Sequence, residues 1–207
     1  HAFDTTPAIE DSPFVTESSL NKQSHHQPNQ QSAESKGDDK DARKTNELLV
    51  WLRDYARDSI NSRQMDERRC LSPGIVLDFG NKGLLGMQVP KQYGGLGLGN
   101  RAMLQIIEQL GAIDPTQALF VGLNNVLGIR PILHFATPAL KEQLLPKLAT
   151  GRVLAAFAIT ETGAGSHPFG ITSTAQQTAD GWQLQGEKIW SGSAAWAGDI
   201  NVFVQQV

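Results

Sequence analysis

The chain has 207 residues, of which 40% are hydrophobic and 19% charged, and its formal net charge is −3 at pH 7. This length allows one large domain or two smaller ones with a buried core. The slightly acidic balance argues against a general nucleic-acid or membrane-surface binder, because such proteins carry an excess of basic residues on one face.

The chain has one cysteine, Cys70, which rules out an intrachain disulfide. Such sparse cysteine usage favours a reducing compartment, so we expect a cytoplasmic protein. No stretch approaches the roughly 20 continuous apolar residues of a membrane span, so we expect no membrane partner.

Residues 1–45 are dominated by Gln, Ser, Asn, Asp and Lys. Such a composition offers too little apolar surface to offset the entropy of ordering, which predicts a disordered polar linker. The chain begins with His1 and stops at Val207 inside a strand-like run. We therefore interpret it as part of a longer polypeptide, with a domain upstream of the linker.

The hydrophobic period becomes helical near Thr45, and five helices are predicted between residues 46 and 151. The second carries Ile75, Val76 and Phe79, and the third buries Leu104 among its apolar residues. Gly151 ends the fifth helix, which completes an all-α bundle. A small polar residue followed by proline, typical of helix starts, occurs at Ser72-Pro73, Asp114-Pro115 and Thr137-Pro138.

From residue 152 onward the pattern is that of strands. Residues 153–159 form a continuous apolar run suited to a buried strand, and residues 171–178 alternate. Asp180-Gly181 predicts a hairpin turn before a partner strand at 182–185. Residues 201–207 alternate again, so the predicted β domain is unfinished where the sequence stops.

The glycine-rich loop at residues 163–170 follows the apolar strand. A dinucleotide-binding fingerprint requires a helix after its glycines, whereas Pro168 and an alternating run follow here, which excludes that interpretation. Backbone N–H groups and the hydroxyls of Thr160, Thr162 and Ser166 are suited to binding an anion or a carbonyl oxygen. The alternative is an ordinary tight turn whose hydroxyls satisfy its own backbone.

Trp190 stands before two small residues, Ser191 and Gly192, which would leave one face of its ring open to a flat ligand. The alternative is packing in the core or at its rim. Trp182 and Trp196 lack that setting, and we assign both to packing.

Two charged positions near these segments allow more than one interpretation. Glu161 is either a general base or a hydrogen-bonding surface residue, and Lys188 is expected to form a solvated pair with Glu187. The sequence shows no nucleophile–base set and no ligand spacing for a metal, so we identify no catalytic residue and no metal site.

Four motifs occur in the order seen in acyl-CoA dehydrogenases, and together they resemble that family over about residues 46–207. The turn at 89–97 is similar to the family's Pro-x-x-Tyr-Gly-Gly-x-Gly. The helix and stop at 140–151, the Ala-x-Thr-Glu-x-Gly-Ala-Gly-Ser strand exit at 158–166 and Gly-Glu-Lys-x-Trp at 186–190 follow.

This resemblance implies an α+β fold: an N-terminal all-α bundle over 46–151 and, over 152–207, the start of an antiparallel β-barrel-like middle domain. The family's C-terminal helical domain is absent from this sequence. The implied cofactor is FAD, and Ser166 would also reach toward the acyl thioester. The implied flavin contacts are Phe157, Ala158, Ile159, Thr160, Gly165, Ser166, Trp190, Ser191 and Gly192.

The implied reaction is α,β-dehydrogenation of an acyl-CoA or acyl-carrier-protein thioester. A carboxylate takes the α-proton while a hydride passes from the β-carbon to the flavin, and electron-transfer flavoprotein or oxygen then accepts the electrons. The family's base lies in its C-terminal domain, so the 207 residues alone are expected to be inactive. Family members are usually homodimers or homotetramers.

The sequence departs from the family at three places. Thr162 stands where the family usually has Pro, His167 where it has Asp, and Ser191-Gly192 where it commonly has Ile-Thr or Ile-Ser. His167 near the thioester entrance suggests an unusual carrier or acyl group. Because relatives that are oxidases or monooxygenases share the N-terminal motifs, such an enzyme remains an alternative, as does a non-catalytic interaction module that has lost its base. The polar leader also suits a dehydrogenase module of a multidomain acyl-carrier synthase.

Overall fold

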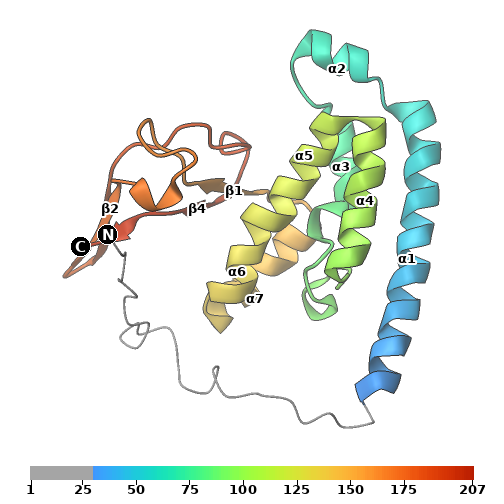
Figure 1. Cartoon of the computed structure of the whole chain (residues 1–207), viewed down its shortest axis with the longest axis horizontal. Helices are drawn as coiled ribbons and strands as arrows, with labels where there is room; N and C mark the ends of the chain where they lie inside the picture. Colours follow the sequence, from blue (N-terminus) through green and yellow to red (C-terminus); the bar gives the residue numbers. More distant parts are fainter. Residues whose placement is uncertain (1–29) are drawn as a thin grey trace, which may run out of the picture. The chain divides into compact units, whose positions relative to one another are not determined.

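The computed structural model describes residues 30–207, in which helices precede short strands (Figure 1). The predicted α+β architecture, a helical domain followed by a partial β region, is confirmed. The α-helices are α1 (Gln30–Ser59), α2 (Ser62–Arg68), α3 (Pro73–Asn81), α4 (Asn100–Ile113), α5 (Pro115–Leu123), α6 (Arg130–Phe135) and α7 (Pro138–Ala149).

The first helix begins at Gln30, earlier than the apolar pattern indicated. The Asp41 carboxylate accepts a hydrogen bond from the Gly99 N–H at 2.9 Å, and Thr45, which is 2% exposed, donates from Oγ1 to the Asp41 carbonyl at 2.7 Å. These polar contacts stabilise the part of α1 around residues 41–45, where hydrophobic periodicity is absent. The prediction of a disordered linker is therefore wrong from Gln30 onward, and residues 1–29 lie outside the described residues.

The core of the helical domain lies between α1, α3, α4 and α5. Leu52, Phe79 and Ile106 are fully buried there, whereas Leu104, predicted to be buried, is 59% exposed on the outer face of α4. The sequence pattern missed α2 because this short helix buries none of its residues. A second cluster, around Leu145 and Leu148 of α7, packs against the start of the β region.

The fourth predicted helix is one continuous run, Pro115–Phe135, made of α5, the π-helical η5 (Asn124–Ile129) and α6. This 21-residue helix contains an 18-residue stretch with a mean hydropathy of 1.3, so by length and composition alone it could cross a membrane. It is not the continuous apolar run that the sequence analysis looked for, because Asn124, Asn125 and Arg130 interrupt it. Buried amide side chains on this helix, Gln117, Asn124 and Asn125, are a feature of a helix packed inside a protein core.

The two asparagines of η5 tie the helix to neighbouring segments. Asn125 accepts a hydrogen bond from the Met87 N–H at 2.9 Å and donates at 2.8 Å to a carbonyl of η3 (Leu84–Gly86). Asn124 accepts from the Ala155 N–H at 3.0 Å, at the first residue of the β region. The Asn124 bond thus anchors the start of the β region to the helical domain, while the Asn125 bonds hold η3 and Met87 against the same helix.

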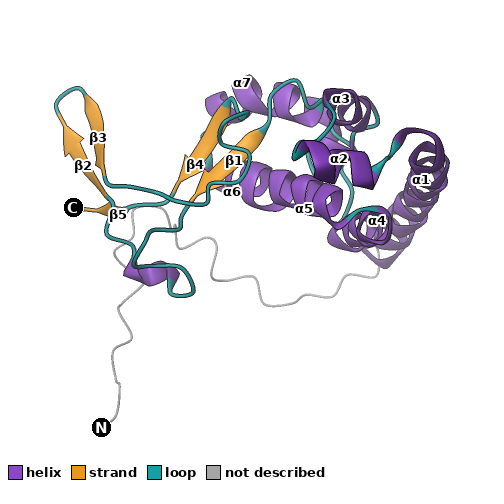
Figure 2. Ribbon diagram, turned by 90° about the horizontal axis from the view of Figure 1, so that it is seen from above, coloured by secondary structure: helices purple, strands orange, loops and turns teal. Residues whose placement is uncertain are grey.

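The strands form two small sheets in the part of the chain that the structure describes, rather than a closed barrel. β1 (Ala155–Ala158) and β4 (Asp199–Val202) pair in parallel beside η5, and Figure 2 shows the hairpin farther from the helices. β2 (Thr174–Thr178) pairs antiparallel with β3 (Gly181–Gln185), which confirms the predicted hairpin, and parallel with β5 (Gln205–Gln206). Two of these three pairings are thus parallel, unlike the expected antiparallel sheet.

Candidate functional site

The loop that leaves β1 makes a tight turn. The Ala164 N–H donates to the Glu161 carbonyl at 3.0 Å, and the Glu161 N–H donates back at 3.3 Å. Residues 161–164 therefore form a tight turn closed by their own backbone. A Cβ added at Gly163 or Gly165 would meet no heavy atom within 4 Å, so the backbone beyond the turn is open to a ligand on its outer side.

Glu161 is a buried carboxylate with a full set of hydrogen-bond partners. Its side chain is 7% exposed and lies 2.7 Å from the ammonium of Lys188, itself 10% exposed. It also accepts from the Thr172 N–H at 2.6 Å, the Thr172 hydroxyl at 2.8 Å and the Ser173 N–H at 2.9 Å. Glu161 is therefore neither a surface residue nor a carboxylate with a free lone pair.

Lys188 joins the two segments that the sequence singled out. Its ammonium donates to the Ile159 carbonyl at 3.1 Å as well as to Glu161. One residue further on, the Ile189 N–H donates to the Thr160 carbonyl at 2.9 Å. The expectation of a solvated Lys188 is wrong, because its partner comes from a distant segment and not from the adjacent Glu187.

The surroundings of Glu161 decide between its two proposed roles. The Lys188 ammonium, together with Ser173 and the Thr172 N–H, holds the pKa of Glu161 far below its usual range. A carboxylate with so low a pKa is a poor proton acceptor near neutral pH. The general-base interpretation of Glu161 is therefore not supported, and its contacts point to a structural role.

We expect this pKa to appear in the pH dependence of stability. In the native state Glu161 releases its proton at a lower pH than in the unfolded chain, whose carboxyl titrates near 4.5. Its contribution is then fully present above pH 4.5 and declines as the pH falls below that value. The stability difference between wild type and Glu161→Gln, measured by urea unfolding, should be constant from pH 8 to about 5 and shrink toward pH 3. A difference that stays constant down to pH 3 would contradict the assignment.

Trp190 follows directly after this junction and is exposed. Its side chain is 84% exposed and its backbone is left-handed, with φ of 57°. Packing is therefore not its role among the described residues. Trp182 and Trp196 are each 54% exposed, so their assignment to packing is wrong as well.

The other residues predicted to contact the flavin lie along the same two segments and do not enclose a pocket. Ala158 is buried in β1, while Phe157, Ile159 and Thr160 are half-buried. Gly165 and Ser166 are exposed in the loop. Ser191 is half-buried, and Gly192 lies against α5, where an added Cβ would be 3.7 Å from Leu123.

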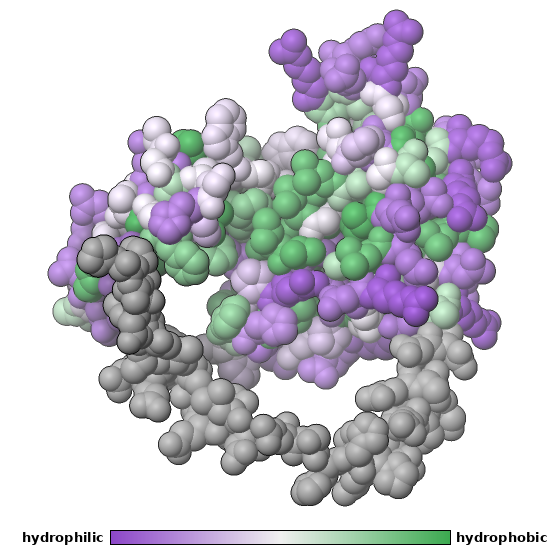
Figure 3. Space-filling model, in the orientation of Figure 1, coloured by the Kyte–Doolittle hydropathy of each residue, from purple (hydrophilic) through white to green (hydrophobic). Residues whose placement is uncertain are grey.

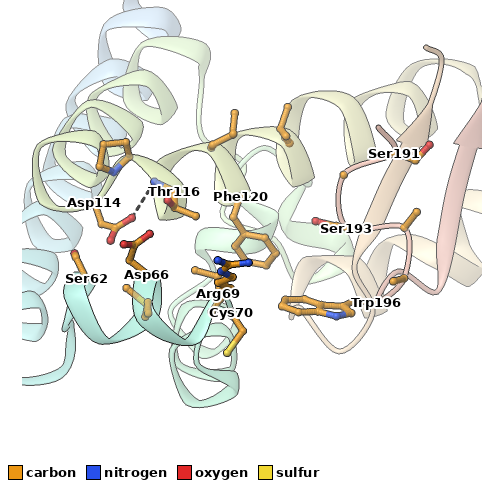
Figure 4. Close-up of a pocket in the computed structure, with 18 residues that line it drawn as sticks. Ser62, Asp66, Arg69, Cys70, Asp114, Thr116, Phe120, Ser191, Ser193 and Trp196 are labelled. Carbon is orange, nitrogen blue, oxygen red and sulfur yellow. Dashed lines mark hydrogen bonds between the residues drawn. The ribbon is translucent and has the colours of Figure 1, made fainter. Parts of the chain in front are cut away.

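A pocket of about 670 Å³ opens beside Ser191 and Gly192, between α2, α5 and the 191–196 loop (Figure 4). Leu119, Phe120 and Leu123 of α5 supply apolar side chains along it. Apolar surface gathers over α4 and α5 on the face shown in Figure 3. Residues 157–166, the first of the two predicted flavin-contacting segments, do not line this pocket.

The side of this pocket formed by α2 carries polar and charged groups beside Met65 and Leu71. Ser62, Asp66 and Arg69 come from α2 and its end, and Asp114 caps α5 by accepting from the Thr116 N–H at 2.9 Å. The sequence pattern missed these residues, because α2 has no apolar face to mark it. The signal in the sequence that could have indicated this pocket is the run of apolar residues on α5, which covers more than one face of that helix.

Two sequence models of known domains match the chain. The acyl-CoA dehydrogenase N-terminal domain matches residues 43–152, and the acyl-CoA dehydrogenase middle domain matches residues 156–206. Together these matches run from α1 to the last strand.

Individual relatives agree with these matches. The very long-chain specific acyl-CoA dehydrogenase of Bos taurus mitochondria is 38% identical over 125 residues, 59% of this chain and 19% of that protein. A 3-(aryl)acrylate reductase of Clostridium sporogenes is 32% identical over 162 residues, 77% of this chain and 43% of that protein. The crystal structure of an acyl-CoA dehydrogenase complexed with FAD from Bacillus anthracis superposes with a TM-score of 0.71 at 30% identity, covering 81% of this chain and 29% of that one. The chain thus spans less than half the length of each of these relatives.

Proposed function

Because this chain belongs to the acyl-CoA dehydrogenase family, we propose that it is part of a flavin-dependent enzyme that introduces an α,β double bond into an acyl thioester. The observation that carries the proposal is the exposed, left-handed Trp190 beside the Glu161–Lys188 junction. A positive φ is an outlier for a bulky non-glycine residue, and such outliers cluster at functional sites. An aromatic ring held outside the core in this way suits a flat ligand.

The residues of the two segments fit a flavin in chemical character. The open loop backbone at Gly163 and Gly165 and the hydroxyls of Thr160 and Ser166 supply donors that suit the polar edge of the ring system. Trp190 supplies an aromatic surface for contact. When bound, FAD would supply the hydride-accepting chemistry of the reaction.

The pocket beside Ser191 and Gly192 is the proposed site of the acyl group. Apolar side chains of α5 would exclude water from a hydrocarbon chain, as apolar lining does in most ligand sites. The polar groups around Asp66 and Arg69 lie at the side formed by α2 and allow the distal end of an acyl group to remain hydrated. Small residues at 191–193 leave room for the group to pass the loop.

The base that removes the α-proton is not Glu161 in this proposal. Its carboxylate is committed to Lys188 and to the backbone at 172–173, and its lowered pKa makes it a weak acceptor. We infer that the base belongs to a part of the enzyme outside these 207 residues. In this proposal the 207 residues bind and orient the cofactor and the acyl thioester and exclude water. By themselves they do not complete the reaction.

The reaction itself is tested in the enzyme that contains this chain. Saturated with FAD and mixed anaerobically with a series of acyl-CoA and acyl-carrier thioesters, the enzyme should lose its flavin absorbance near 450 nm with at least one of them. Enoyl thioester should form in the same amount as reduced flavin. An FAD-saturated enzyme that bleaches with none of these thioesters would overturn the proposal. Rapid oxygen consumption by the reduced enzyme would instead favour the oxidase or monooxygenase alternative.

A further inference from the structure

The Glu161–Lys188 ion pair is unusual in its burial, since its two side chains are only 7% and 10% exposed. Desolvating two charges costs free energy that their attraction often fails to recover, and an apolar pair of similar size is frequently as stable. Stability alone is therefore a weak reason for placing this pair here. Charged groups with defined hydrogen-bond directions fix geometry more narrowly than apolar contacts do.

The contacts of the pair reach three separate segments. Glu161 stands in the loop after β1 and holds the backbone of Thr172 and Ser173, which leads into β2. Lys188 stands before Trp190 and holds the carbonyl of Ile159 at the end of β1. The pair thus connects the loop, the entry to the hairpin and the return from it.

The return segment must also approach closely for the pair to form. Gly186 has φ of 144°, and a Cβ there would overlap Ser173, whose hydroxyl is buried with no hydrogen-bond partner among the described residues. Only glycine allows the chain to pass at this distance. The hairpin that precedes Gly186, Thr174–Gln185, has mostly exposed side chains. It therefore gives the strand-exit loop and the Trp190 segment little apolar support.

We propose that the Glu161–Lys188 ion pair is a positioning element that fixes the spacing between the strand-exit loop and the Trp190 segment, and thereby sets how tightly and in what environment the flavin is held. The inference rests on the proposed function for its ligand, but the positioning role concerns residues of this chain alone. The Ile189–Thr160 hydrogen bond, next to the pair, reports that spacing directly. Loss of either charge leaves the other buried and lets the two segments separate.

The experiment compares wild type with Glu161→Gln, Lys188→Met and the double variant, made in the enzyme that contains this chain. The first readout is amide hydrogen exchange at Ile189, Thr172 and Ser173, and the second is the dissociation constant and visible absorbance spectrum of bound FAD. We expect each single variant to exchange faster at Ile189 and to weaken FAD binding about tenfold. The double variant should be little worse than either single variant, because the two residues act as a unit.

Two control variants separate positioning from other effects. Leu52→Ala opens a cavity in the core of the helical domain and lowers stability without touching the pair, so the absorbance spectrum of bound FAD should be unchanged. Trp190→Ala should weaken FAD binding through lost contact while leaving Ile189 exchange as in wild type. Lys188→Arg, which keeps the charge, should restore part of the loss seen with Lys188→Met.

Failure of the inference and failure of the proposed function give different results. Unchanged Ile189 exchange in Glu161→Gln would overturn the positioning role whether or not FAD binds. Faster exchange with unchanged FAD affinity and spectrum would overturn the link to the flavin. If the wild-type enzyme binds no FAD at any concentration, the proposed cofactor is wrong. The exchange data would still decide whether the ion pair fixes the two segments.

Discussion

Replacing Asn125 by alanine is expected to lower the free energy of unfolding by about 3 kcal/mol, because two buried backbone groups lose their partners at once. The side chain is 1% exposed, accepts from the Met87 N–H at 2.9 Å and donates to the Leu84 carbonyl at 2.8 Å. Both partners lie in a turn segment that has no ladder to replace these bonds. A third bond, to the Val121 carbonyl at 2.9 Å, holds the amide in place.

Urea unfolding followed by far-ultraviolet circular dichroism measures this loss. The matched control is Asn81→Ala, the same substitution at an exposed position of α3, which should change stability by less than about 0.5 kcal/mol. Asn125→Asp keeps the acceptor for Met87 but turns an oxygen toward the Leu84 carbonyl, so it should not rescue the loss. A change below about 1 kcal/mol in Asn125→Ala would show that water satisfies these groups and that the asparagine is dispensable.

Gly128→Ala is expected to be comparably damaging, at about 3 kcal/mol, through a steric conflict. Gly128 lies in η5, where a Cβ would be 2.5 Å from the carbonyl oxygen of Ala155 and 2.7 Å from its Cβ. Neither group is the far end of a flexible side chain, so the helix and β1 would have to move apart. That movement would also pull on Asn201, whose amide donates to the Gly128 carbonyl at 2.6 Å.

The same helix supplies the control for this variant. A Cβ added at Gly122 in α5 would be 3.8 Å from Ile107, an ordinary van der Waals distance. Gly122→Ala should therefore be neutral or stabilise the protein by up to about 1 kcal/mol, since alanine favours the helix. Thermal unfolding of the two variants should separate them clearly, with Gly128→Ala the less stable. Equal melting temperatures would show that β1 yields to the added methyl group without cost.

Much of the helical domain was predictable because its signals act within a few residues. Asp114 accepts from two N–H groups of the following helix, and Thr137 accepts from Leu140 at 3.3 Å. Ser72 makes no such bond, although Pro73 begins α3 as predicted. The Asp180-Gly181 turn likewise needs only its own backbone to reverse the chain. The start of α1 was mispredicted because its first residues carry no hydrophobic periodicity that would mark a helix.

The candidate site was predictable only as two stretches of sequence. The turn at 161–164 and the small residues after Trp190 are visible in the residues themselves, and their flavin contacts stay predictions. The burial of Lys188 was not visible, because its adjacent residue, Glu187, suggested a solvated pair. The pocket on α5 was missed for a similar reason, since its polar wall comes from α2, a helix with no apolar pattern.

The sequence by itself determined the elements whose causes are local: helix caps, helix stops, the hairpin turn and the change from helical to strand period. The tertiary structure decided which charges are buried and which segments meet. Glu161 and Lys188 are separated by a whole hairpin, and the spacing that brings them to 2.7 Å depends on the close passage at Gly186 and on the anchoring of β1 by Asn124. Such contacts arise from packing between distant segments, which no short stretch of sequence encodes.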